Sequence, residues 1–212
     1  MVGWSRQMLY SGFSILPRSV IRSVNSIDRS DNLDVIPPNP MKWTIANCDI
    51  LDRPADVLVL SCNPQLNLSG GAGGSFLVRY GDEMQGRMHE YLASTGKRHV
   101  DRGEVIQMPP CNSPYAAVLH VVGVDAFYDS SPEIVSTAIV KSLKMAAALG
   151  AETVTLTAIA TGYGRMSIED FATAVLPVVP MEFSPIRNVD ICLTKQDAAR
   201  ELAELIPSAA VG

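Results

Sequence analysis

Apolar runs of strand length alternate with helix-like periodicity along residues 41–212. Six runs are rich in aliphatic and β-branched residues, as strands buried on both faces are: residues 43–51, 56–63, 104–108, 116–123, 153–160 and 189–193. Between most of them, apolar residues recur three or four positions apart, which places their side chains on one helix face. The helices predicted in this way span residues 76–80, 83–94, 131–149, 167–176 and 197–205. The alternation predicts an α/β fold, a three-layer α/β/α sandwich with helices on both faces of a central sheet.

The helix at residues 131–149 has the clearest sequence signals. Pro132 suits the first turn of a helix, and Gly150 is a typical stop at the carboxyl end. Ile134 and Leu143 contribute to its apolar face. We therefore expect this helix to pack against the sheet along its length.

The composition predicts a single domain that binds neither nucleic acid nor a metal. The chain has 212 residues, 47% of them hydrophobic, and a net charge of −5, which argues against a nucleic-acid backbone as partner. No two cysteines have Cys-x-x-Cys spacing, and the candidate histidines lack cysteine or carboxylate partners at ligand spacing. We expect buried free thiols in a reducing compartment and neither a metal nor another cofactor. The residues concerned are Cys48, Cys62, Cys111, Cys192, His89 and His99.

Residues 1–40 are predicted to be an N-terminal extension and a proline-rich linker ahead of the domain. Their first thirty residues interleave apolar side chains with arginine and serine and contain Asp28 as the only acid, a composition typical of a mitochondrial transit peptide. The alternative is an extension that packs onto the domain. The proline-rich residues 36–40 predict a stiff linker, so the domain is expected to begin at Met41. We expect a cytoplasmic protein, or a mitochondrial one if the extension directs import, and no apolar run is long enough to cross a membrane.

A glycine cluster follows the strand predicted at residues 56–63. The strand ends on Asn63, and residues 69–74 then read Ser-Gly-Gly-Ala-Gly-Gly before a helical pattern. Glycines before a helix let the backbone approach a ligand closely, and the first N–H groups of the helix favour a phosphate. The cluster lacks the Gly-Lys-Ser/Thr ending of a P-loop and the last glycine of the dinucleotide fingerprint. By itself it fits a phosphate cradle and a purely structural turn equally well.

Five short motifs in register resemble the macrodomain family. They are Cys48-Asp49-Ile50-Leu51, Leu60-Ser61-Cys62-Asn63, the run from Ser69 to Gly74, Leu119-His120-Val121-Val122-Gly123 and Ala160-Thr161-Gly162-Tyr163-Gly164. The resemblance covers about residues 41–205. It implies a macrodomain over residues 41–212, a mixed central sheet and a site for ADP-ribose.

The resemblance also implies a role for individual residues. Asp49 would accept a hydrogen bond from the adenine amino group beside the backbone N–H of Ile50, whereas a capping or turn role is the alternative. Asn63 would hold the distal ribose and orient a water, as the candidate catalytic residue, whereas satisfying its own turn is the alternative. Two backbone runs would enclose the diphosphate: Gly70, Gly71, Ala72, Gly73 and Gly74 on one side, and Thr161, Gly162, Tyr163 and Gly164 on the other.

Three further polar residues receive other interpretations. His120 lies in an apolar strand and is expected to be a core histidine with its hydrogen bonds satisfied. Asp56 precedes its strand and is expected to be structural. Arg165 could reach a phosphate or point to solvent, and both possibilities stay open.

Departures from the family pattern keep two function classes open. Many ADP-ribosyl hydrolases of the family have Asp and His where this chain has Gly73 and Leu77, and an aromatic residue that stacks on adenine where it has Thr194. The first class is a hydrolase of an ADP-ribosyl ester on a protein or an acyl metabolite, working by positioning substrate and water. The second is a non-catalytic reader of ADP-ribose or another nucleotide. We favour the hydrolase narrowly and expect no nucleic-acid or membrane partner.

Overall fold

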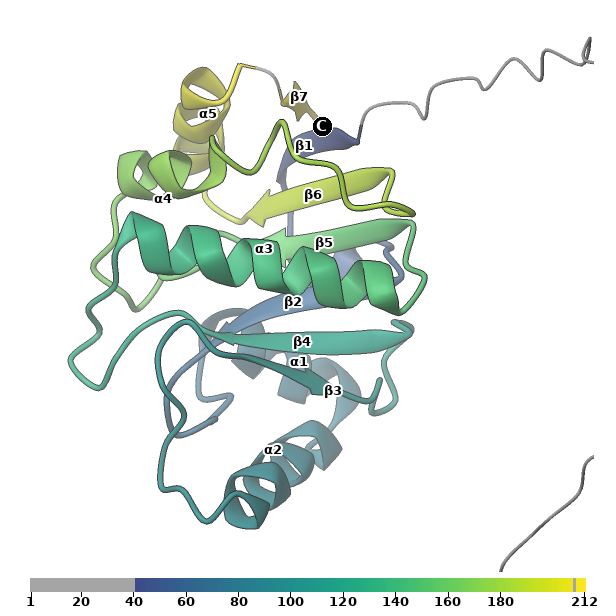
Figure 1. Ribbon diagram of the computed structural model, residues 1–212, viewed down its shortest axis with the longest axis vertical. Helices are drawn as coiled ribbons and strands as arrows, with labels where there is room; N and C mark the ends of the chain where they lie inside the picture. The colour runs from purple at the N-terminus through teal and green to yellow at the C-terminus, as the bar shows by residue number, and fades with distance from the viewer. Residues whose placement is uncertain (1–40, 208) are drawn as a thin grey trace, which may run out of the picture. The chain divides into compact units, whose positions relative to one another are not determined.

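The computed structural model describes residues 41–207 and 209–212, and their strands form one mixed sheet (Figure 1). The strand order is β3-β4-β2-β5-β6-β1-β7. Only the β3–β4 pair among them is antiparallel. The bounds are β1 Lys42–Asn47, β2 Val57–Cys62, β3 Val105–Met108, β4 Ala117–Val122, β5 Thr153–Thr157, β6 Asn188–Leu193 and β7 Ala210–Val211.

Helices cover both faces of this sheet, so the predicted three-layer sandwich is confirmed. Figure 1 shows α3 in front of the strands and α1 behind them. The helices are α1 Gly71–Tyr80, α2 Glu83–Ser94, α3 Pro132–Ala148, α4 Ile168–Val175 and α5 Gln196–Leu205, with a short 3₁₀ turn η1 at Ile50–Asp52. None of the helices in the described part of the chain is long and apolar enough to span a membrane.

Two hydrophobic cores lie on opposite faces of the sheet because successive strand residues point to opposite sides. On the α3 face, Leu119 and Leu156 belong to the same buried cluster as Leu143 of α3. On the α1 face, Leu58 and Phe76 of α1 share the second cluster. The β2 run Val57–Cys62 alternates between the two clusters, which explains why it is apolar at nearly every position.

The helix boundaries follow local capping chemistry. Ser131 accepts a hydrogen bond from the Ile134 N–H with Pro132 in the first turn of α3, and Ser167 accepts one from the Asp170 N–H at the start of α4. Gly150, with φ +78°, follows the end of α3 as predicted.

Some predicted boundaries are wrong. The strand predicted at residues 43–51 stops at Asn47, because Asp49 caps the η1 turn instead of continuing the strand. The run at 153–160 stops at Thr157, and Ala160 adopts φ +66°. The two-residue β7 is absent from the prediction because two residues carry no periodic pattern. The interpretation of residues 1–40 falls outside the described residues and stays a prediction.

Candidate functional site

A cleft of about 780 Å³ lies at the carboxyl ends of the parallel strands. Its lining comes mainly from the segments that follow β1, β2, β4, β5 and β6 and from the first turn of α1. This edge of an open α/β sheet is where ligands bind, because loops from several strands converge there. Every residue predicted to bind the ligand lines this cleft except Gly74.

The glycine cluster forms the first turn of α1, so the predicted helix start at Phe76 is wrong by five residues. Gly71 adopts φ +53°, which is unfavourable for other residues, and no side chain caps the helix. Gly71, Ala72 and Gly73 line the cleft, and the first N–H groups of a helix have no intrahelical partner, as an anion site requires. Gly74 does not line the cleft, and its N–H donates to the carbonyl of Gly70 at 3.1 Å within the helix turn.

The second backbone run lies across the cleft from α1. A Cβ at Gly164 would overlap the carbonyl oxygen of Ala160, so only glycine allows this tight approach of the loop to itself. Tyr163 is 73% exposed, yet its ring crosses to the first run. A Cβ on Gly70 would lie 2.5 Å from the Tyr163 hydroxyl. Tyr163 thus spans the two backbone runs at the mouth of the cleft.

Asp49 lies at the β1 end of the cleft and has two kinds of contact. Its Oδ1 accepts from the backbone N–H of Leu51 at 2.9 Å, so the capping role is realised. Its Oδ2 is 3.9 Å from the guanidinium of Arg79, which binds Asp52 more closely at 2.6 Å. One carboxylate oxygen of Asp49 therefore remains weakly engaged beside the cleft.

Asn63 lines the cleft at the end of β2, but its carboxamide holds its own loop. Its Oδ1 accepts from the Asn67 N–H at 3.0 Å, and its Nδ2 donates to the Asn67 carbonyl at 3.3 Å. The turn role considered from sequence is therefore present. The Asn67 side chain also lies 2.9 Å from Nε2 of His89, and that nitrogen lies 2.9 Å from Gln85.

Several cleft residues were missed by sequence reasoning. Tyr128 lines the cleft from the loop after β4, and Lys195 is the single Lys or Arg among the described lining residues. The hydroxyl of Thr157 is buried in the lining without a hydrogen-bond partner in the described residues. The sequence gives no signal for these three residues, because none of them belongs to a recognisable motif. Thr194 also lines the cleft, whereas Arg165 pairs with Asp129 at 3.3 Å and does not line it.

The cysteines are free thiols, and three of them are buried. Burial raises the pKa of Cys62 far above its usual range and that of Cys192 to about 12. Cys48, however, is half-buried and lines the cleft, and its thiol donates to Sγ of Cys192 at 3.5 Å. No group of three or more potential metal ligands occurs in the described residues.

His120 is fully buried in β4, but the expected hydrogen bonds are missing. Neither ring nitrogen has a hydrogen-bond partner in the described residues. Its neighbours across the sheet are Leu60 in β2 and Ile106 in β3. Desolvation lowers the pKa of His120 to about 3, so the ring is neutral at pH 7. The prediction of a satisfied histidine is wrong, whereas its core position is confirmed.

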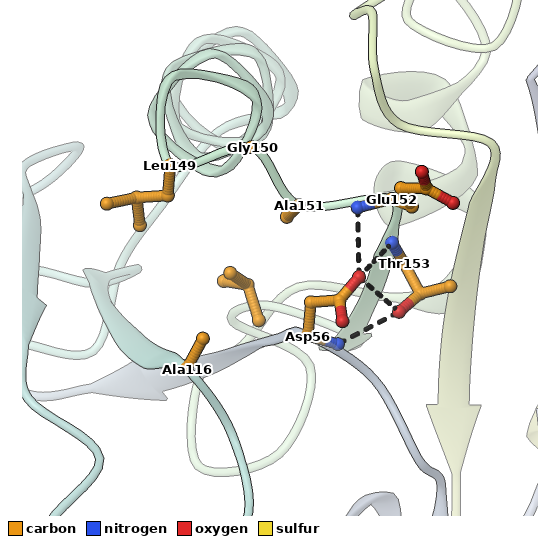
Figure 2. Close-up of a pocket in the computed structure, with 8 residues that line it drawn as sticks. Asp56, Ala116, Leu149, Gly150, Ala151, Glu152 and Thr153 are labelled. Carbon is orange, nitrogen blue, oxygen red and sulfur yellow. Dashed lines mark hydrogen bonds between the residues drawn. The ribbon is translucent and has the colours of Figure 1, made fainter.

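A second cavity of about 360 Å³ lies at the opposite ends of the strands (Figure 2). There Oδ2 of Asp56 accepts from the N–H groups of Glu152 and Thr153 and from the Thr153 hydroxyl, each at 2.9 Å. These bonds lower the pKa of Asp56. The carboxylate joins the start of β2 to the start of β5, which agrees with a structural role for Asp56.

Comparison with known proteins identifies similar sequences. Residues 59–175 match the family model of the Macro domain. The chain is 27% identical over 160 residues to a macro domain-containing protein of Streptomyces griseus, covering 74% of this chain and 90% of that one. It is 24% identical over 176 residues to an uncharacterized protein of Mycobacterium tuberculosis H37Rv, covering 83% of this chain and 44% of that one. The chain thus spans less than half the length of this mycobacterial relative.

Solved structures share the fold at low identity. The Oceanobacillus iheyensis macrodomain with ADP has a TM-score of 0.71 at 18% identity, with 80% of this chain and 92% of that chain covered. The Trypanosoma brucei macrodomain in complex with ADP-ribose has a TM-score of 0.64 at 15% identity, with 77% and 68% covered. These likenesses show that the chain shares the fold of these macrodomains.

Proposed function

Because this chain belongs to the Macro domain family, we propose that its cleft binds ADP-ribose or a related ADP-ribose derivative. The observation that carries the proposal is the pairing of the uncapped α1 N-terminus with the loop at residues 161–164 across one cleft. Two sets of backbone donors suit a diphosphate even in a protein of net charge −5. The cleft volume of about 780 Å³ is in the range of small-molecule sites.

The proposed ligand orientation follows from the two ends of the cleft. Asp49 offers its weakly engaged Oδ2 to an exocyclic amine, so the adenine lies at the β1 and β6 end. Asn63 lies at the β2 end and takes the distal ribose. Tyr163 covers the diphosphate between them, because its ring already spans the two backbone runs.

Titration calorimetry with ADP-ribose tests binding. Asp49→Ala removes both the adenine contact and the Leu51 cap, whereas Asp49→Asn retains an acceptor for the cap. Loss of one charge-assisted hydrogen bond should weaken affinity roughly 10-fold to 150-fold in both variants. Gly71→Glu places a carboxylate and bulk at the diphosphate and should abolish binding. Absence of heat with folded wild-type protein at millimolar ADP-ribose would refute the proposal.

The finer function that we propose is hydrolysis of an ADP-ribosyl ester. Asp49 is the single carboxylate among the described residues that line the cleft, and it lies at the adenine end. Among the described residues that line the cleft, no Asp, Glu or His lies beside Asn63, and Leu77 packs in the α1 core without lining the cleft. Such a site works by orientation alone, which suits an ester because its carboxylate is a good leaving group. The alternative is a reader that binds ADP-ribose without turnover.

Release of free ADP-ribose from a mono-ADP-ribosylated ester substrate separates these functions. If the chain is a hydrolase, Asn63→Ala should reduce turnover far more than ADP-ribose affinity, because orientation at the reacting carbon matters most in the transition state. Asn63→Asp retains the acceptor for the Asn67 N–H and controls for loss of the loop. Tight binding with no turnover in the wild type would identify a reader.

A further inference from the structure

A pair of thiols lies at the proposed adenine end of the cleft. Cys48 follows the last residue of β1, and Cys192 lies in the adjacent parallel strand β6 opposite Ala46. The backbone N–H of Cys48 donates to the Leu193 carbonyl at 3.1 Å, which holds the two segments together. The two sulfur atoms are 3.5 Å apart, and both residues line the cleft.

The two thiols differ in access. Cys48 is half-buried and sits in a bend after the strand, so a small oxidant in the cleft can reach its sulfur. Cys192 is 5% exposed, and its Sγ lies 3.3 Å from the Thr155 hydroxyl. An accessible thiol beside a second, resolving thiol is the arrangement found in reversible redox sites.

We propose that Cys48 and Cys192 are an oxidation site, a dithiol that a peroxide converts to a disulfide across the β1 and β6 end of the cleft. In the first step, the Cys48 sulfur attacks one peroxide oxygen, the O–O bond breaks, and Cys48 sulfenic acid and water form when the oxidant is hydrogen peroxide. In the second step, the Cys192 sulfur displaces the sulfenic oxygen, which leaves as water with the Cys192 proton. The two thiols lose two electrons, and the peroxide gains them.

Disulfide formation needs the sulfurs to approach to about 2.05 Å, roughly 1.5 Å closer than they now are. Cys192 is fixed in the β6 ladder, whereas Cys48 lies beyond the end of β1. Cys48 therefore moves, and it carries the neighbouring Asp49 with it. This consequence rests on the proposed function: the disulfide weakens ADP-ribose binding, and bound ADP-ribose protects Cys48 by the same factor at equilibrium.

Peptide mapping of peroxide-treated protein tests the chemistry without any ligand. The expected product is a Cys48–Cys192 cross-linked peptide that dithiothreitol reverses. Cys192→Ser should leave Cys48 as a sulfenic or sulfinic acid, and Cys48→Ser should leave no cross-link. Cys62→Ser and Cys111→Ser are matched controls outside the pair and should retain the cross-link. Wild-type protein that yields only sulfinic Cys48, or that leaves both thiols intact, would overturn the proposal.

Calorimetry of reduced and oxidised protein with ADP-ribose tests the consequence. We expect at least a 10-fold loss of affinity on oxidation, restored by dithiothreitol and absent in Cys48→Ser treated in the same way. Equal affinity of the reduced and disulfide forms would refute the coupling. If reduced protein does not bind ADP-ribose at all, the proposed function is refuted. The oxidation site is tested independently by the cross-link in the peptide map.

Discussion

Replacing His120 should change the pH dependence of stability in a calculable way. The ring is fully buried and neutral, with a pKa of about 3 in the fold, whereas an unfolded histidine has a pKa of about 6.5. The unfolded chain therefore binds a proton below pH 6.5 that the fold does not accept until about pH 3. Stability is retained above pH 6.5 and is lost as the pH falls from there towards 3.

The magnitude follows from the two pKa values. At pH 4.5, about two pH units below the unfolded value, His120 should cost the fold about 3 kcal/mol relative to pH 7.5. His120→Gln keeps a polar side chain but does not titrate, so the loss of stability that His120 causes between pH 7.5 and 4.5 should disappear in this variant. The same loss should disappear in His120→Leu. The free energy of unfolding of this variant should also rise by about 1–3 kcal/mol at pH 7.5, because the unpaired ring nitrogens are removed.

Urea unfolding followed by the fluorescence of tryptophan, including buried Trp43, measures these differences at pH 7.5 and 4.5. Carboxylates also titrate in this range, so the quantity to compare is the change between the two pH values in each variant. If wild type and His120→Gln lose equal stability between these pH values, the neutral buried histidine is refuted.

Three other substitutions test features of the backbone and the polar contacts. Gly164→Ala should lower the free energy of unfolding by about 1–3 kcal/mol, because the new Cβ overlaps the Ala160 carbonyl, whereas Gly162→Ala meets open space and should have little effect in the same urea titration. Asp56→Ala should cost about 1 kcal/mol at pH 7, and since hydrogen bonds lower the Asp56 pKa, its advantage over the variant should fade as acid protonates the carboxylate. In thermal melts, Asn63→Ala should destabilise the protein by about 1 kcal/mol through the freed loop, and an unchanged melting temperature would contradict the loop contacts.

The sequence predicts most of the fold because its local signals agree with its global pattern. Apolar runs located the six longer strands, and Ser131, Gly150 and Ser167 fix helix ends through contacts with neighbouring residues. The glycine cluster predicts a loop ahead of the helix, because glycine disfavours helices. In the structure, Gly73 and Phe76 are buried against the rest of the fold, and this packing outweighs the low propensity.

The rest of the site depends on contacts between distant segments. Cys48 and Cys192 are 144 positions apart in the sequence, and only the pairing of β1 with β6 brings their sulfurs together. The same holds for Lys195, which reaches the cleft because β6 runs beside β1. The sequence does not decide the role of Asn63, because an asparagine after a strand can bind a ligand or hydrogen-bond its own turn. Only the atomic positions distinguish these two roles.

Because strands that lie far apart in the sequence are neighbours in the sheet, ligand binding to the cleft depends on assembly of the sheet. The cleft is lined by segments following β1, β2, β4, β5 and β6, and β1, the first of these strands in the sequence, pairs with β6, the last of them. No contiguous fragment containing only one of these strands holds a complete cleft. A ligand of the cleft therefore has affinity for the assembled sheet alone, and saturating it raises the unfolding free energy by RT ln(1 + [L]/Kd). A thermal-shift titration with candidate nucleotides consequently measures, in a single experiment, whether the strands that form the cleft are correctly assembled.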